Sequence, residues 1–350
     1  MSRAALLLAA FVAISCSKDD SIDEAKGPPP VDAARRSTTG TMPNAKPRTP
    51  GDPRLEKLFA RGEVCTWNKW GMSKCPVADE IRKLAFNHQG DKKLAAGCAS
   101  ALADGKLFVR GLAAACMRGF NDSARIPQLS AGLDAFEAEP NPGVRVAIAW
   151  AFSNGNAAES GLEGRVVALV GKLGSNPTQL EVASHWFRSL FPRYVLGKGK
   201  PTRVASDFAL ATAKNGQGQL QITAIGVLGR LRHRADEACS LLVGLTTPEL
   251  ARVTVPQLAR LGPACVSKLD PVIALIAKQL STGKMYASET GGIHALLRSV
   301  PLTGKQLATL KRASKKNVAN ATGYRAKTAR ELDDRLVGYT PPNGTKKQLN

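Results

Sequence analysis

Five segments of this chain share one pattern, and their spacing constrains the fold more than any other feature. A polar residue in third place is followed by small apolar residues in FVRGLAAACM, GVRVAIAWAF, QLEVASHWFR, QLQITAIGVL and LARVTVPQLA. The polar residues are Arg110, Arg145, Glu181, Gln221 and Arg252, which are 35, 36, 40 and 31 residues apart. A period of this length predicts stacked helical hairpins, because each hairpin buries its two faces against its neighbours.

The chain from Asp52 onward has helical signals almost throughout. Helix starts are expected at Pro76, at Pro142, in NPTQLE (176–181), in TPELAR (247–252) and in GPACVSKL (262–269), because proline in the first turn and a polar cap favour helix initiation. No convincing strand alternation occurs. Aromatic residues are only 5% of the chain, so the core must consist mainly of Ala, Leu and Val. These observations predict an all-α fold.

Two segments, PGVRVAIAWAFSNGN and TPELARVTVPQLARLG, resemble HEAT repeats. The second half of such repeats often has a Val-Arg pair followed by small apolar residues. The resemblance implies an α-solenoid of roughly seven HEAT-like hairpins over residues 76–338. The alternative is a non-repetitive helical bundle.

The first residues are typical of an export signal. Arg3 precedes eleven apolar residues, Ala4 to Ile14, a run too short to span a bilayer. The sequence AISC, which ends at Cys16, resembles the lipobox of bacterial lipoproteins, with Ala13 where Leu is usual. The resemblance implies a signal peptide over residues 1–15 and lipid attachment, including palmitate, at Cys16. An ordinary secretory signal, which would leave Cys16 unmodified, is the alternative.

The segment after Cys16 is rich in proline and polar residues, and residues 16–53 are therefore expected to form a disordered tether. Its length corresponds to a span of about 30 to 35 Å. Residues 54–75 are expected to form an N-terminal cap whose loop contains Trp67 and Trp70, with a binding knob as the alternative role for the two tryptophans. Residues 339–350 are expected to form a disordered basic tail.

The chain has seven cysteines, and six remain once Cys16 is set apart as a lipidation site. An even number in an exported protein indicates disulfides, with free buried thiols as the alternative. Six cysteines allow fifteen pairings, so the sequence does not fix the connectivity, but order along the chain favours Cys65 with Cys75 and Cys98 with Cys116. Cys239 and Cys265 are expected to pair because they lie at similar heights in two parallel, neighbouring helices. None of the histidines lies at the short distance in sequence from a pair of cysteines that is typical of zinc fingers, so no zinc site is expected.

The formal net charge is +21, and the excess is concentrated near the C-terminus. Eleven basic and three acidic residues lie between Lys305 and Lys347. Lys311, Arg312, Lys315 and Lys316 fall on one face of the expected helix. Such a face would suggest nucleic acid in the cytoplasm, but export leaves anionic lipids, envelope polymers or acidic proteins as partners. The alternative is a solvated face without a partner.

Catalytic motifs are weak in this sequence. No G-x-S-x-G or H-E-x-x-H occurs, and the S-x-x-K spacing of Ser281 and Lys284 lacks its usual companion motifs. His185 and His294 are interpreted as packing residues. No enzymatic activity, cofactor or metal is therefore expected.

The leading hypothesis is a lipid-anchored periplasmic or outer-membrane scaffold or adaptor that binds a protein partner through its helical repeats. Ser17, which follows Cys16 in place of an aspartate, favours the outer membrane. A basic module that binds an anionic envelope polymer or lipid surface is the first alternative, and an enzyme of unrecognised type is the second.

Overall fold

The computed structural model describes residues 51–68, 71–191, 201–284 and 287–342. The expected signal peptide, Cys16, most of the tether, Trp70 and residues 343–350 lie outside the described residues. The described fold is all-α, with one short hairpin of strands. None of its helices is long and apolar enough to cross a membrane.

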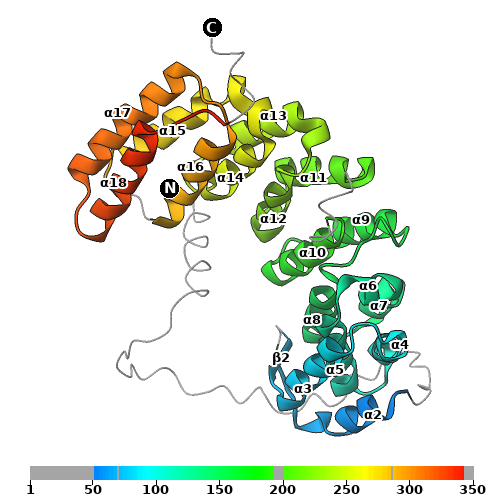
Figure 1. Ribbon diagram of the computed structural model, residues 1–350. Coiled ribbons are helices and arrows are strands. Elements are labelled where there is room, and N and C mark those ends of the chain that lie inside the picture. Colours follow the sequence, from blue (N-terminus) through cyan, green and yellow to red (C-terminus); the bar gives the residue numbers. More distant parts are fainter. Residues whose placement is uncertain (1–50, 69–70, 192–200, 285–286, 343–350) are drawn as a thin grey trace. The chain divides into compact units, whose positions relative to one another are not determined.

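Eight helices form a series that we call the first row, in which each member contacts the next (Figure 1). These helices are α3 (Pro76–Asn87), α5 (Leu107–Gly119), α8 (Pro142–Phe152), α10 (Pro177–Ser189), α12 (Gly218–Leu228), α14 (Ala251–Leu261), α16 (Ala287–Ser299) and α18 (Tyr324–Val337). Their order in the row is their order in the sequence.

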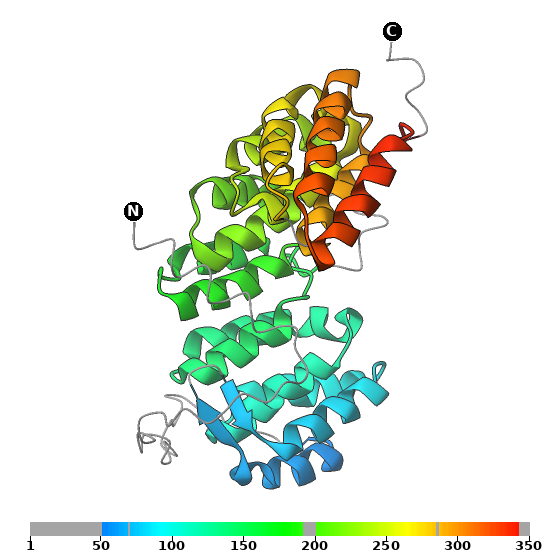
Figure 2. The same cartoon turned by 90° about the vertical axis from the view of Figure 1, so that its left-hand side faces the viewer.

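A second row of helices alternates with the first along the chain. Its members are α2 (Pro53–Ala60), α4 (Lys92–Ser100), α7 (Leu129–Ala138), α9 (Glu163–Lys172), α11 (Arg203–Asn215), α13 (Ala235–Leu245), α15 (Asp270–Leu280) and α17 (Gly304–Asn320). Helix α11 contacts α9 and α13, and α15 contacts α17. Figure 2 shows α17 and α18, coloured orange to red, side by side, and the contacts between them agree.

Short helical segments connect the rows. They are α6 (Asp122–Arg125) and the 3-10 helices η1 (Gly62–Val64), η2 (Ala101–Ala103), η3 (Ile126–Gln128), η4 (Arg232–Arg234) and η5 (Gly262–Lys268). The buried side chains between the rows are mostly Ala, Leu and Val, as the composition predicts.

The five similar sequence segments lie on α5, α8, α10, α12 and α14, which are five successive members of the first row. The repeat spacing therefore predicted both the helices and the neighbours that they pack against. The HEAT-like resemblance itself stays a prediction. Matching places in the segments do not have matching environments, since Trp186 is fully buried and Trp150 is 44% exposed.

Three expected helix starts agree with the structure. Proline occupies the first turn of α3, α8 and α10. Asn141 accepts hydrogen bonds from the backbone amides of Gly143 and Val144, and Asn176 accepts one from that of Gln179. These asparagines satisfy amides that have no partner within the helix, and the local sequence therefore determines where the helices begin.

The other two expected helix starts agree only in part. TPELAR begins with a turn in which the amide of Ala251 donates to the Thr247 carbonyl, and α14 starts inside this segment, at Ala251. GPACVSKL is the 3-10 helix η5, and α15 starts at Asp270. Pro271 has no amide hydrogen, so a single α-helix could not continue from Gly262 through it without losing a hydrogen bond.

Strands β1 (Thr66–Asn68) and β2 (Gly71–Lys74) form an antiparallel hairpin where a loop was expected. They were missed because three or four residues are too few to show alternation. Strand β2 contacts α8, so the hairpin lies on a first-row helix distant in sequence. Trp70 and the side chain of Trp67 lie outside what the structure describes, so the expected role of the two tryptophans stays a prediction.

The ends of the fold differ slightly from the expected boundaries. Helix α2 begins at Pro53, inside the expected tether, and Asp52 caps it. At the other end, the hydroxyl of Tyr339 donates to the Val300 carbonyl at 2.8 Å and accepts from the Leu302 amide at 2.9 Å. Tyr339 therefore belongs to the fold and not to a disordered tail.

Candidate functional site

Three disulfides join the six cysteines of the described region. They are Cys65–Cys75, Cys98–Cys116 and Cys239–Cys265, with Cα atoms 4.4, 6.0 and 5.3 Å apart. These are the expected pairs. Disulfides persist in oxidising compartments, and the three bonds therefore indicate an extracytoplasmic environment.

Contrary to the expectation from the sequence, the third pair does not join two parallel α-helices. Cys239 is in α13, but Cys265 is in the 3-10 helix η5 and not in a second α-helix. Close approach is still achieved because η5 packs directly against α13. The disulfides also differ in burial, since Cys65 and Cys75 are partly exposed and the other four cysteines are fully buried.

We use the term basic face for Lys311, Arg312, Lys315 and Lys316, all of which lie in α17. Arg312, Lys315 and Lys316 are exposed, and Lys311 is partly buried. Within the described part of the chain, no carboxylate lies within 4.0 Å of any of the four, whereas Lys305 of the same helix is 3.4 Å from Asp270. The basic face can therefore attract anions without first breaking an ion pair.

Helix α17 is held firmly by its first turn. Thr303 and Gln306 form a capping box, in which each side chain bonds the backbone amide of the other residue. The Gln306 amide group also donates to the Val266 carbonyl at 2.9 Å and to Asp270 at 2.8 Å. These bonds tie α17 to α15, so the basic face is carried by a well-anchored helix.

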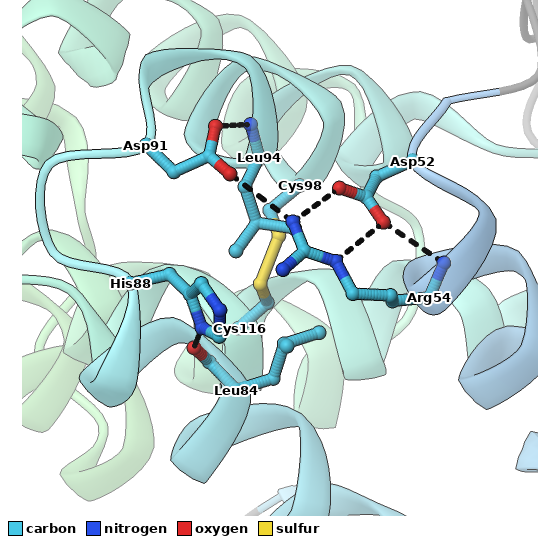
Figure 3. Close-up of polar contacts among 8 residues, drawn as sticks. All are labelled: Asp52, Arg54, Leu84, His88, Asp91, Leu94, Cys98 and Cys116. Atoms are coloured by element: carbon cyan, nitrogen blue, oxygen red, sulfur yellow. Dashed lines mark hydrogen bonds and ion pairs between the residues drawn. A yellow bond between two sulfur atoms is a disulfide. The ribbon is translucent and has the colours of Figure 1, made fainter.

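A cluster of charged residues lies where the described fold begins (Figure 3). The Arg54 guanidinium donates to both carboxylate oxygens of Asp52, at 2.9 and 2.6 Å, and to Asp91 at 3.1 Å. Asp52 caps α2 and Asp91 caps α4. The hydrogen bond from Arg54 lowers the pKa of Asp52, and the bond from the Leu94 amide, followed by Arg54, lowers the pKa of Asp91.

Asp52, Arg54 and Asp91, which we call the start cluster, have a structural role in this arrangement. The guanidinium of Arg54 is shared by two carboxylates that also cap helices, so its binding capacity is already used. His88 is similarly engaged, because its Nδ1 is 2.8 Å from the Leu84 carbonyl oxygen and donates to it. The Cys98–Cys116 disulfide fastens α4 to α5 beside these residues (Figure 3).

Arg110, one of the repeated polar residues, forms a fully buried ion pair. Its Nε donates to Glu139 at 2.6 Å, and its Nη2 donates to the other carboxylate oxygen at 3.0 Å. Its Nη1 donates to the carbonyls of Asp104 and Gly105. Glu139 also accepts from the Asn141 amide at 2.8 Å. Both charges are fully engaged, and the pair joins α5 to the segment before α8.

Arg118, Trp150 and His185 form a stack that the sequence did not reveal. The Arg118 guanidinium carbon is 3.2 Å from the centroid of the Trp150 ring, and the rings of Trp150 and His185 are 6.0 Å apart and inclined by 22°. The sequence predicts a packing role for His185, and its burial agrees with this. The three residues are 32 and 35 positions apart, close to the repeat period, and that spacing was the only available signal.

Ser281, Lys284 and His294 lie in positions that are common for these residue types in helical proteins. The Ser281 hydroxyl donates to the Ala277 carbonyl at the end of α15, and Lys284 is exposed. His294 is partly buried, and its pKa is lowered by burial and then by Arg335 and Arg298. No group of three or more potential metal ligands is found in the described residues.

A comparison with models of known protein families found no match, and a comparison with curated proteins found no significant one. The function is therefore inferred from the sequence and the described residues alone.

Proposed function

We propose that this chain is a membrane-anchored extracytoplasmic lipoprotein that serves as a helical-repeat scaffold or adaptor for a protein partner. One observation carries the proposal: successive helices of the first row pack in sequence order from α3 to α18. Such a row places the outer faces of many helices side by side. Repeat proteins use surfaces of this kind to bind other proteins over a long contact.

The anchor in this proposal is Cys16. The apolar leader, the sequence AISC and the polar segment that follows support it. Two or more acyl chains are needed for stable membrane binding, and a lipid-modified N-terminal cysteine supplies them. The disulfides are compatible with export, because they require an oxidising compartment.

Crosslinking in intact cells, followed by purification of the chain from the membrane fraction, tests the proposal. A protein partner should be recovered with the native chain. The Cys16→Ala variant should appear in the aqueous fraction. Failure to recover a partner above background would contradict the scaffold function. A mass measurement that finds an unmodified Cys16 in the mature chain would contradict the anchor.

A second candidate function is favoured by the basic face of α17, whose four cations have no carboxylate partner among the described residues. A cluster of this kind can lie against an anionic lipid surface, where each cation contributes about 1 kcal/mol. The binding should weaken at high salt, because exposed charges are screened.

Co-sedimentation with vesicles that contain phosphatidylglycerol tests this candidate. Replacement of Lys311, Arg312, Lys315 and Lys316 by glutamate should abolish sedimentation with the vesicles. A matched control replaces four exposed lysines of the first helices, Lys57, Lys83, Lys92 and Lys93, by glutamate. The control has the same net charge, so equal loss in both variants would show that only the total charge matters.

A further inference from the structure

Three successive helices of the first row each contribute one planar group to the stack of Arg118, Trp150 and His185. Arg118 lies in the last turn of α5, Trp150 near the end of α8 and His185 in α10. The indole of Trp150 contacts both the guanidinium and the imidazole. It is nevertheless 44% exposed, whereas His185 is buried. The stack therefore presents part of an indole and a guanidinium at the surface of the first row.

Arg118 has no carboxylate partner among the described residues. It is partly buried, and the contact with the Trp150 ring is the only favourable contact of its guanidinium within the described part of the chain. Two buried arginines differ in this respect, because Arg110 pairs with Glu139 and Arg125 pairs with Asp122. Burial, followed by the charge of Arg82, lowers the pKa of Arg118. A bound anion would favour the charged form of Arg118 and so offset both of these unfavourable effects.

Apolar surface lies on the neighbouring helix as well. Phe86 of α3 is 70% exposed, and it follows Arg82 by four residues on the same face of that helix. Helix α3 packs against α5, which contains Arg118. Arg82 itself is occupied, because it donates to the Asp79 carboxylate and to the Ala78 carbonyl. The two first-row helices that pack against α5, which are α3 and α8, thus each carry one exposed aromatic side chain, and α5 carries the Arg118 guanidinium.

We propose that Arg118, Trp150 and Phe86 form the binding site for an acidic segment of a partner protein, in which a carboxylate lies next to an apolar side chain. The carboxylate accepts hydrogen bonds from the guanidinium of Arg118, and the apolar side chain packs against the indole. Tryptophan and arginine are the residues that most often dominate protein interfaces. This inference rests on the proposed scaffold function, for which it names a contact surface and a partner chemistry.

The chemistry favours a peptide carboxylate over a membrane at this place. Anionic membranes are bound by clusters of four or more cations, whereas here Arg118 is accompanied by aromatic residues and by an arginine that is already paired. A planar guanidinium matches a carboxylate with two parallel hydrogen bonds. A guanidinium that is already held over an indole has fewer orientations to lose on binding.

Binding to an array of synthetic peptides tests the inference. The array combines Asp or Glu with adjacent Leu, Phe or Trp, and each peptide has a counterpart with Asn or Gln in place of the acids. Acidic peptides should bind the full-length chain, and their amide counterparts should bind at least tenfold more weakly. The Arg118→Gln variant should lose at least tenfold in affinity for the acidic peptides, and Trp150→Ala should lose a similar factor.

Arg145→Gln provides the matched control. The Arg145 guanidinium also lies over an aromatic ring, 4.6 Å from that of Phe136, but it is outside the proposed site. This variant should bind the peptides like the native chain, and circular dichroism should be the same for all variants. Equal binding of acidic and amide peptides, or unchanged binding by Arg118→Gln, would overturn the inference. So would an Arg118→Gln variant that loses binding to phosphatidylglycerol vesicles and not to peptides.

Crosslinking in cells separates this inference from the function on which it rests. If the native chain recovers a protein partner and Arg118→Gln recovers the same amount, the binding site is wrong and the scaffold function stands. If the native chain recovers no partner, both are wrong. If Arg118→Gln recovers less of the partner and Arg145→Gln recovers the normal amount, the result supports both the binding site and the scaffold function.

Discussion

Helices α4, α5 and α8, near the start of the described fold, differ from α17 and α18 at its end in how their charges are arranged. The first group contains the Cys98–Cys116 disulfide and is joined by the buried pair of Arg110 and Glu139. In α17, the exposed cations of the basic face have no carboxylate partner among the described residues.

The difference follows from burial. Arg110 is completely removed from water, so it requires a carboxylate and several carbonyls to replace its hydration. Lys315 and Lys316 remain in water and need no partner. Charge therefore joins segments of the chain in the first region and stays in contact with water in the second.

The largest effect is expected when the buried pair is broken. Replacement of Glu139 by alanine leaves the buried Arg110 without an anion and should reduce the free energy of unfolding by about 3–5 kcal/mol. Urea denaturation followed by circular dichroism measures the change. Replacement of Glu80, whose pair with Arg61 is exposed, is the control and should have little effect. If Glu139→Ala changed the free energy of unfolding only slightly, burial would not explain why charges are arranged differently in the two regions.

A somewhat smaller effect is expected from the covalent link in the first region. Replacement of both Cys98 and Cys116 by alanine removes a constraint across 18 residues of sequence. The free energy of unfolding should fall by about 3 kcal/mol, because the unfolded chain gains entropy. The same denaturation experiment measures it. Native protein treated with a reductant should be no more stable than the variant, because the other two disulfides are reduced as well. No difference between oxidised and reduced protein would contradict the prediction.

In the second region, removal of the helix cap of α17 should reduce the free energy of unfolding by about 1 kcal/mol. Thr303→Ala removes the side chain that accepts from the Gln306 amide in the capping box of α17. Hydrogen exchange of the amides in α17 should increase, because the helix end opens more easily. Thr309→Ala is the control, since the Thr309 hydroxyl only donates to the Lys305 carbonyl within the helix. Equal effects of the two changes would exclude a special role for the cap.

The smallest effect on stability is expected when the start cluster is altered, and the size of this effect depends on pH. The folded state lowers the pKa of Asp52 and Asp91 below the usual 3.8, so their contribution to stability is present above that value and is lost as the pH falls below it. The midpoint temperature of thermal unfolding should differ slightly between the native protein and Arg54→Gln at pH 6, and this difference should be smaller at pH 2.5. A difference that increases as the pH falls would contradict the role of Arg54 as the partner of the two ionised carboxylates.

Several parts of the fold were predictable because their signals are local. Pro142 and Asn141, or Pro177 and Asn176, mark helix starts through groups that lie within three residues of one another. The repeat spacing extended this reasoning to neighbouring helices, since equivalent segments must pack in order. The pairing of Cys65 with Cys75 followed from proximity in sequence.

Other parts were beyond such reasoning. The hairpin of β1 and β2 is too short for a periodic signal, and its contact with α8 spans about 70 residues of sequence. The different burial of Trp150 and Trp186 could not be read from their matching places in the repeats. Burial depends on what each helix packs against, and a repeat pattern does not specify that for an individual side chain.

By itself, the sequence determined the all-α class, most helix starts and the basic face of α17, because each depends on residue type at short or regular spacing. It favoured the three cysteine pairs, and the tertiary structure decided among the possible pairings. Only the tertiary structure decided which charges are compensated. Arg110 and Glu139 meet across 29 residues, whereas Arg118 meets an indole 32 residues away and no carboxylate among the described residues. Hydrogen bonds and ion pairs act over a few ångströms, so distant residues acquire partners only when the helices pack.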